Sequence, residues 1–221
     1  MLRIEDLNLN GLKIYQDDEL YHFTSDAIIL SRFAKVKKGD LVADFCAGSG
    51  IVGLHLYGLN MDKIKEVHLF EIQEQMCEIA KKSIEINDLN DKFRVFNCDL
   101  SVLPTEFNGK YSLITCNPPY ATVDSSEQNK NESLAISKTE LKIDLERLIK
   151  AVSRALKFGG RFCLVHRIER TAEIIYQMIK NGVEPKIIQP VSAKNKQPYV
   201  VLIEGVKGGK IGVKMLNTLI N

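Results

Sequence analysis

Short apolar runs alternate with amphipathic stretches along most of the chain. Runs rich in β-branched, aromatic and other apolar residues predict strands at residues 41–46, 67–72, 93–98, 112–116 and 161–166. Between them, apolar residues recur at helical spacing over residues 74–87 and 140–156. Strands that alternate with helices predict a mostly parallel sheet with helices on both faces. The pattern therefore predicts an α/β, Rossmann-like fold, for which we expect a seven-stranded sheet.

The two ends of the chain break this alternation. Residues 183–191 and 199–206, separated by a polar stretch, predict an antiparallel strand pair. Residues 11–24 predict a hairpin with its turn near Asp17-Asp18, followed by a helix through Ala34 that Thr24, Ser25 or Asp26 caps. We expect one domain over residues 1–221, made of an N-terminal extension (1–35) and a core (36–221).

A glycine pair is expected to end the helix over residues 140–156. Phe158-Gly159-Gly160 stands between this helix and the strand over residues 161–166. Glycine adopts the left-handed conformation that commonly ends a helix. The helix is therefore predicted to stop at this tripeptide.

Composition narrows the class of protein without indicating its function. Apolar residues make up 45% of the chain and charged residues 26%, as in ordinary globular proteins. No apolar run approaches the roughly 20 residues of a membrane span, and the start lacks a signal-peptide pattern. Five cysteines without a C-x-x-C pair indicate reduced, mostly buried thiols and no metal site. We expect a cytoplasmic protein that has no membrane contact and no obligate protein partner.

The net charge of +2 hides an uneven distribution. Residues 186–221 contain six lysines and one glutamate, whereas the rest of the chain carries a small net negative charge. A basic end can contact phosphate groups, which supply most of the non-specific affinity of nucleic-acid-binding proteins. A solvated lysine-rich surface explains the same composition.

A glycine-rich loop follows the first strand of the alternating region. Residues 44–53, Asp-Phe-Cys-Ala-Gly-Ser-Gly-Ile-Val-Gly, satisfy the G-x-G-x-x-G pattern between a strand and a helix. Ala47, Gly48 and Gly50 would let the backbone approach a nucleotide closely. Glu71 ends the second strand, where an acidic side chain accepts hydrogen bonds from ribose hydroxyls, and Ile72 follows it. These residues predict a cofactor site.

Asp44 helps to identify the cofactor class. A dinucleotide carries a pyrophosphate that a nearby carboxylate would repel, whereas S-adenosylmethionine carries a sulfonium and an ammonium group that it would attract. Asp99 ends the third strand, where it can accept a hydrogen bond from the adenine amine. Either aspartate can instead cap a neighbouring helix. S-adenosylmethionine is the cofactor that this pattern favours.

The fourth strand ends in Asn117-Pro118-Pro119-Tyr120. Ligands bind at the carboxyl ends of parallel strands, and two prolines stiffen this turn and remove two backbone donors. The Asn117 side-chain oxygen and the Pro118 carbonyl can accept both N–H bonds of a planar amine, which frees the nitrogen lone pair for attack on a methyl group. Tyr120 can stack on a flat base. We predict Asn117, Pro118 and Tyr120 as catalytic residues, with Asn117 also near the cofactor.

These two motifs in this order resemble the class I methyltransferases that act on planar amino nitrogens. More closely, the chain resembles the bacterial family that N6-methylates the adenine beside the anticodon of a valine tRNA. The resemblance extends over most of the chain, through Phe23-Thr24-Ser25-Asp26-Ala27, residues 44–53, Asn117-Pro118-Pro119-Tyr120, residues 159–167 and 184–186, and the ending Val206-Lys207-Gly208-Gly209-Lys210.

The resemblance implies a class I methyltransferase fold, S-adenosylmethionine as cofactor and a tRNA anticodon loop as partner. It places Thr24 and Asp26 near the methionine portion of the cofactor, and His166 and Arg167 near the substrate. His166 and Arg167 can also be a plain surface pair at a strand end. The chain departs from the family at Ala121, where members often carry an aromatic residue, and at residues 137–140, where they often carry a basic stretch.

Three other functions are compatible with parts of this pattern. A glutamine amide of a protein presents the same planar nitrogen, but glutamine methyltransferases usually carry an additional N-terminal domain, and only about 40 residues precede the first strand here. A DNA adenine methyltransferase normally needs a separate recognition domain. A non-catalytic RNA-binding factor could retain the fold. Residues 121–138, polar and without periodicity, are predicted to form a long loop beside the site.

Overall fold

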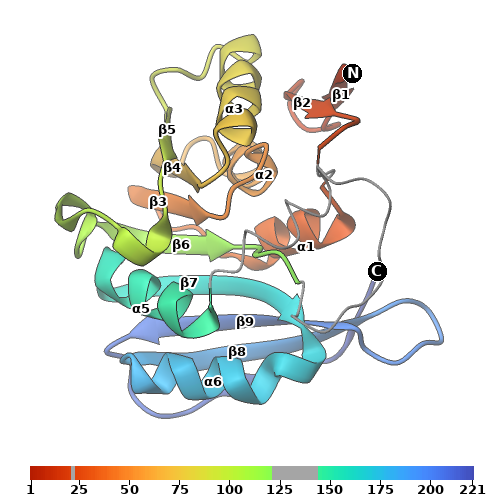
Figure 1. Ribbon diagram of the computed structural model, residues 1–221. Coiled ribbons are helices and arrows are strands. Elements are labelled where there is room, and N and C mark those ends of the chain that lie inside the picture. The colour runs from red at the N-terminus through yellow and green to blue at the C-terminus, as the bar shows by residue number, and fades with distance from the viewer. Residues whose placement is uncertain (21–22, 121–143) are drawn as a thin grey trace.

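The fold is built on one twisted sheet flanked by helices (Figure 1). The computed structural model describes residues 1–20, 23–120 and 144–221. In this part of the chain the sheet has nine strands in the order β10-β8-β9-β7-β6-β3-β4-β5, with β11 also paired to β8. The strands are β3 (Asp40–Phe45), β4 (Ile64–Glu71), β5 (Phe93–Asn97), β6 (Tyr111–Cys116), β7 (Leu156–Arg167), β8 (Val183–Ser192), β9 (Val200–Lys207), β10 (Lys214–Met215) and β11 (Leu219–Ile220).

The predicted α/β class I methyltransferase architecture is confirmed. Strands β5, β4, β3, β6 and β7 are mutually parallel, and β9 runs antiparallel between β7 and β8. The predicted antiparallel pair at the C-terminal end is therefore present as β8 and β9. Two short strands were not expected: β10 and β11 lie parallel to β8 and extend the seven-stranded sheet.

Helices cover both faces of the sheet. Helices α1 (Ser25–Phe33), α2 (Ile51–Leu59) and α3 (Glu74–Ile86) lie on one face, and α5 (Leu145–Ala155) and α6 (Thr171–Lys180) on the other (Figure 1). Short 3-10 turns η1 (Leu100–Val102), η2 (Thr105–Phe107) and η3 (Ile168–Arg170) complete the connections. No helix in the described ranges is both long and apolar enough to span a membrane.

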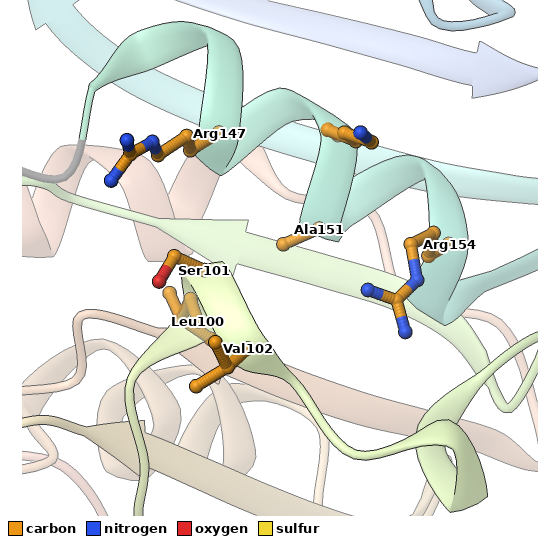
Figure 2. Close-up of a pocket in the computed structure, with 7 residues that line it drawn as sticks. Leu100, Ser101, Val102, Arg147, Ala151 and Arg154 are labelled. Atoms are coloured by element: carbon orange, nitrogen blue, oxygen red, sulfur yellow. The ribbon is translucent and has the colours of Figure 1, made fainter.

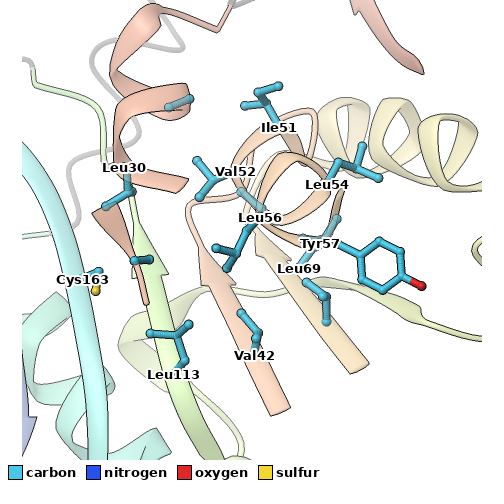
Figure 3. Packing of buried hydrophobic residues seen from close by; sticks show 14 of the residues in the cluster. Leu30, Val42, Ile51, Val52, Leu54, Leu56, Tyr57, Leu69, Leu113 and Cys163 are labelled. Atoms are coloured by element: carbon cyan, nitrogen blue, oxygen red, sulfur yellow. The ribbon is translucent and has the colours of Figure 1, made fainter. Parts of the chain in front are cut away.

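Each face of the sheet has its own hydrophobic core. Alternate residues of β3 serve the two cores, because successive side chains of a strand point to opposite faces: Val42 joins the cluster under α1 and α2, and Ala43 joins the cluster under α5 and α6. Figure 3 shows the first cluster, with Val42, Leu69 and Leu113 of the sheet facing side chains of α2. All six residues of β6 are buried, as expected for a strand covered on both sides.

The order of the strands brings two loops together. The chain forms β3, β4 and β5 outward in one direction, then crosses to the other side of β3 to form β6 and β7. This reversal makes a topological switch point between β3 and β6, where ligands bind in open α/β sheets. The glycine-rich loop after β3 and the tetrapeptide after β6 therefore lie at the same edge, here called the catalytic edge.

The N-terminal hairpin differs from the prediction. Strand β1 (Leu2–Asp6) pairs antiparallel with β2 (Lys13–Asp17), so the turn lies between them and not near Asp17-Asp18. Asn8, Asn10 and Gly11 all have positive φ in this turn, a conformation that asparagine and glycine tolerate best. The chain's Asn-Leu-Asn-Gly sequence was therefore the overlooked turn signal. The following helix matches its prediction, with Thr24 at the N-cap and Ala34 at the C-cap.

The helix before β7 ends earlier than predicted. Helix α5 stops at Ala155 and β7 begins at Leu156, so Phe158-Gly159-Gly160 lies inside the strand and does not end the helix. The pairing of β7 with β6 shifts register between Tyr111 and Leu113, and Gly159 takes a positive φ at this irregularity. The glycines therefore serve a bulge in the strand. The predicted start of the helix at residue 140 lies outside the described residues.

Candidate functional site

The loop after β3 is shaped by residues with unusual backbone conformations. Cys46, Gly48 and Gly50 all have positive φ, and Gly50 is the N-cap of α2. Gly53 has a different function: a Cβ there would come within 2.6 Å of a Leu69 methyl carbon, so only glycine allows α2 to lie this close to β4. The loop consequently points the N-terminus of α2 toward the catalytic edge, as the sequence pattern predicted for a nucleotide site.

Asp44 is almost completely buried at the base of this loop. One carboxylate oxygen accepts a hydrogen bond from the Gly53 N–H at 3.1 Å, and the other accepts one from the Thr115 hydroxyl at 2.8 Å. Its side chain thus ties the first turn of α2 to β6. Burial raises the pKa of Asp44 to about 7, although both hydrogen bonds act in the opposite direction. Sequence reasoning did not identify Thr115, because only the pairing of β3 with β6 brings it beside Asp44.

Glu71 ends β4 directly under the glycine-rich loop. Its carboxylate accepts hydrogen bonds from the N–H groups of Gly48 at 2.8 Å, Ile72 at 2.9 Å and Gln73 at 3.0 Å. A carboxylate has about four acceptor positions, so roughly one remains for a ribose hydroxyl. Burial raises the pKa of Glu71 despite these three bonds. Ile72 is 46% exposed, so its side chain lies open beside this carboxylate.

Asp99 follows β5 at the same edge. Its side chain is the N-cap of η1 and accepts a hydrogen bond from the Ser101 N–H at 2.7 Å. Asp99 therefore does cap the turn that follows it, as the alternative interpretation of this residue predicted. Because Asp99 is exposed and only one of its oxygens makes this bond, the second oxygen remains available to a ligand amine.

The tetrapeptide leaves β6 beside the loop. Asn117 and Tyr120 are half-buried, Pro118 is buried and Pro119 is exposed. The Tyr120 hydroxyl lies 3.1 Å from the Asn117 side-chain oxygen and 3.1 Å from an Asp26 carboxylate oxygen. A hydroxyl has one proton, so it donates to one of these two acceptors at a time. Tyr120 therefore connects the tetrapeptide to α1.

Asp26 is the centre of a small polar network that joins distant parts of the chain. It is buried, which raises its pKa, while the hydroxyls of Tyr120 and Tyr199 donate to its two oxygens at 3.1 and 3.5 Å. The Asn221 side-chain amide donates to the Tyr199 hydroxyl at 3.3 Å. Tyr199 was not identified from the sequence, since no motif marks it. By contrast, Thr24 is exposed at the N-cap of α1 and its side chain makes no capping bond.

His166 packs against Tyr120 of the tetrapeptide. Its ring centroid lies 5.2 Å from that of Tyr120, and its Nδ1 accepts a hydrogen bond from the Arg167 N–H at 2.8 Å. Burial lowers the pKa of His166 to about 4, so the ring is neutral near pH 7. His166 is 3% exposed and thus is not a surface residue, whereas its neighbour Arg167 is exposed at the catalytic edge.

The six C-terminal lysines do not form one surface. Lys194 and Lys196 lie in the turn between β8 and β9 at the catalytic edge, whereas Lys207 ends β9 at the opposite edge. Lys207 donates to the Leu156 carbonyl and Lys186 to the Lys210 carbonyl. These lysines therefore do not form a single basic face at the C-terminal end of the chain. Among the described residues, no three His, Cys, Asp or Glu side chains gather as metal ligands would.

Two relatives that the chain resembles in sequence carry the same name. The chain is 24% identical over 152 residues to the tRNA1(Val) (adenine(37)-N6)-methyltransferase of Flavobacteriaceae bacterium strain 3519-10, covering 69% of this chain and 62% of that protein. It is 24% identical over 156 residues to the enzyme of the same name from Dyadobacter fermentans, covering 71% of this chain and 62% of that protein. The matched region thus spans less than two thirds of either relative.

Solved structures share the fold. A predicted O-methyltransferase from Agrobacterium tumefaciens matches with a TM-score of 0.69 at 21% identity, covering 88% of this chain and 86% of that one. A geranyl diphosphate C-methyltransferase from Streptomyces coelicolor, in complex with S-adenosyl-L-homocysteine, matches with a TM-score of 0.61 at 14% identity, covering 83% and 78%.

The family is established by a match that spans most of the chain. The profile of the methyltransferase small domain covers residues 23–185, which include the glycine-rich loop, Glu71 and the tetrapeptide. S-adenosylmethionine, the cofactor predicted from the sequence, is the methyl donor of this family. The geometry at the switch point and this profile lead to the same conclusion: the chain belongs to the methyltransferase small domain family.

Proposed function

We propose that this chain transfers a methyl group from S-adenosylmethionine to the N6 amine of an adenine in tRNA, at the position beside the anticodon of a valine tRNA. One observation carries the proposal: the half-buried Asn117 carboxamide lies at the switch point, in a tetrapeptide that Tyr120 anchors to Asp26. The names of the relatives support tRNA as the substrate class. Such a substrate agrees with the expected cytoplasmic location.

The residues at the edge fit S-adenosylmethionine. Glu71 keeps one acceptor position for the ribose, with Ile72 exposed beside it for the adenine ring, and Asp99 would accept from the adenine amine. The backbone of Ala47, Gly48 and Gly50 would lie along the middle of the cofactor. Asn117 would lie beside its methyl group. Thr24, Asp26 and Asp44 would surround the cationic methionine end, where two buried carboxylates favour positive charge.

The chemistry rests on acceptors fixed by the tetrapeptide. S-adenosylmethionine supplies an electrophilic methyl group when it is bound. The Tyr120 hydroxyl donates to the Asn117 oxygen or to Asp26 at any one time. A carbonyl oxygen has two lone pairs, so the Asn117 oxygen can in either case accept from the adenine amine. Together with the Pro118 carbonyl it would hold both N–H bonds and leave the nitrogen lone pair free. The nitrogen would form the new N–C bond as the S–C bond of the methyl donor breaks, and would then release one proton to water.

His166 and Tyr120 would shape the base pocket. Because the pKa of His166 is lowered to about 4, the ring cannot supply a proton near pH 7. Its contact with Tyr120 holds the tyrosine ring, whose remaining surface can stack on the base. Arg167, exposed next to it, would contact a phosphate or base at the mouth of the pocket. The proposal therefore assigns positioning to His166 and needs no general base.

Methyl transfer to tRNA can be measured directly. Purified protein, labelled S-adenosylmethionine and a tRNA pool that lacks the modification should yield N6-methyladenosine in digested tRNA by mass spectrometry, confined to one tRNA. Transfer to a protein glutamine in the same assay, with none to tRNA, would instead support the glutamine methyltransferase alternative. Absence of transfer to any substrate alongside firm RNA binding would support the non-catalytic alternative.

An Asn117→Ala variant tests the residue that carries the proposal. Loss of one fixed acceptor should lower kcat by about 10²- to 10³-fold, comparable to removal of a single oxyanion-hole donor. Affinity for tRNA should stay within about twofold, because phosphate contacts dominate binding. Asn90→Ala, which removes an exposed carboxamide on the connection before β5, is the matched control and should retain full activity. Equal activity of the Asn117 variant and this control would contradict the assignment.

A further inference from the structure

A cavity outside the methyl-transfer site lies between η1 and α5. It has a volume of about 380 Å³ and is lined by Leu100, Ser101, Val102, Arg147, Lys150, Ala151 and Arg154. Figure 2 shows Arg147 and Arg154 extending from α5, with Ser101 and Val102 on the facing turn of η1. We call this place the basic groove. The sequence motifs did not indicate it, because its two sides are about 50 residues apart in the chain.

The charge of the basic groove is unbalanced. Arg147, Lys150 and Arg154 follow each other at i, i+3 and i+7, which places them on one face of α5. None of the seven lining residues is acidic. Glu146, the nearest acid along the helix, is engaged by Lys180 at 2.8 Å. Like charges at this spacing repel one another, so the groove is suited to an anion that binds all three.

The arrangement fits a chain of phosphates better than a single one. Seven residues of α-helix span about 10 Å, and phosphates follow each other every ~3.4 Å along the axis of a stacked strand. Arg154 also donates to the Leu103 carbonyl at 3.1 Å, which holds that end of the groove in place. The wall made by Leu100 and Val102 is apolar, and Val102 is 72% exposed, so a ribose could pack against it.

The position of the groove relates it to the catalytic edge. Turn η1 begins directly after Asp99, at the carboxyl end of β5. Helix α5 starts at the same edge of the sheet and runs back to the start of β7. Arg147 is therefore nearest the catalytic edge and Arg154 farthest from it. We propose that the basic groove binds the phosphodiester backbone of the substrate RNA, outside the nucleotide that enters the methyl-transfer site. This inference rests on the proposed tRNA substrate.

A pair of substitutions that removes two positive charges tests the groove without disturbing its fixed end. In Arg147→Gln/Lys150→Gln both altered side chains are exposed, and Arg154 keeps its bond to Leu103. The matched control is Lys63→Gln/Lys65→Gln, which removes the same charge from exposed residues at the start of β4, the edge opposite the catalytic one. The measurements are the Kd for tRNA over a range of salt concentrations, the KM and kcat for methyl transfer, and the Kd for S-adenosylhomocysteine.

The groove variant should bind tRNA about tenfold more weakly. The slope of log Kd against log salt should fall by about 1 to 2, because a protein that makes fewer phosphate contacts releases fewer counterions when it binds. KM for tRNA should rise with it, while kcat at saturating tRNA and the Kd for S-adenosylhomocysteine stay at the control's values. A tRNA affinity and salt slope equal to those of the control would overturn the proposal. So would tight binding of adenosine monophosphate that the variant alone loses while tRNA affinity persists.

Failure of the proposed function gives a different result. If wild-type protein methylates no tRNA, the assignment of the substrate is wrong whatever the groove variant does. In that case, a loss of affinity for RNA in the groove variant and not in the control would still support the groove as an RNA site.

Discussion

Asp44 shows how one residue can serve both the fold and the ligand. Its carboxylate is 1% exposed and accepts from Gly53 and Thr115, so it ties the loop that would hold the cofactor to the strand that carries the tetrapeptide. An acid whose pKa rises on folding binds more protons in the native state. Between its ordinary value of 3.8 and about 7, the contribution of Asp44 to stability therefore falls as pH rises.

Asp44→Asn separates these two functions. The asparagine can accept from Gly53 and donate to the Thr115 oxygen, so the contacts survive while the charge is lost. In urea unfolding at pH 8, the variant should be more stable than wild type by about 1 to 3 kcal/mol, because wild-type Asp44 carries a buried charge there and asparagine does not. The difference should be smaller at pH 5, where wild-type Asp44 is mostly protonated.

The same variant reports on the cofactor. If the carboxylate faces the methionine end, affinity for S-adenosylmethionine should fall by about tenfold at pH 8, where wild-type Asp44 is ionised. Calorimetric titration checks this value. A variant with greater stability and unchanged affinity for S-adenosylmethionine would restrict Asp44 to its structural role.

Among the elements, a buried ion pair connects β7 to β3 across β6, the strand that lies between them. Arg161 of β7 lies 2.5 Å from the Asp40 carboxylate at the start of β3 and also donates to the Lys35 carbonyl. Asp40 accepts in turn from the Lys37 N–H at 2.7 Å. Both charged side chains are more than 90% buried. The pair lies at the amino end of the strands, so it supports the sheet from the edge opposite the site.

Arg161→Met should lower the free energy of unfolding by about 3 to 5 kcal/mol, because it leaves the Asp40 charge buried without its partner. Adding Asp40→Asn should recover part of this loss, since the amide still accepts from Lys37 but carries no charge. Urea unfolding of both variants tests the pair. If the single variant unfolds at the wild-type midpoint, the ion pair does not hold the two strands together.

At the scale of the whole molecule, the site lies where the elements of both halves of the sheet converge. The glycine-rich loop belongs to the half with β4 and β5, while the tetrapeptide, His166 and Tyr199 belong to the half with β7 and β9. Asp26 adds a contact from the helix layer. A ligand that contacts both halves of the sheet and the helix layer should therefore stabilise the entire fold and not one half alone.

S-adenosylhomocysteine should raise Tm in proportion to its binding. At about 100 times its Kd, a ligand adds about 2.7 kcal/mol to the free energy of unfolding. For a domain of this size, each kcal/mol corresponds to about 2 to 4 °C, so Tm should rise by about 5 to 10 °C. The dinucleotide NAD at the same concentration is the control and should leave Tm unchanged, because Asp44 repels its pyrophosphate. A shift with NAD alone would reverse the choice of cofactor class.

Local patterns in the chain were sufficient to predict most of its elements and its two motifs. The alternation of apolar runs placed β3 to β6 within a few residues, and the glycine-rich loop and tetrapeptide were recognisable because the chemistry of each depends on adjacent residues. The errors also had local causes. A turn with asparagines at positive φ was overlooked, and Phe158-Gly159-Gly160 was interpreted as a helix stop although it forms an irregularity in β7.

Tertiary structure alone decided which residues meet. Tyr120 and Tyr199 reach Asp26 across 94 and 173 positions of the chain, and the basic groove joins η1 to α5. No sequence periodicity encodes such contacts, because they depend on the strand order and on how helices pack over the sheet. Local sequence patterns thus predicted the fold class and the motifs of the catalytic edge, whereas packing produced the network around Asp26, the burial that shifts the pKa of Asp44, and the dispersal of the C-terminal lysines.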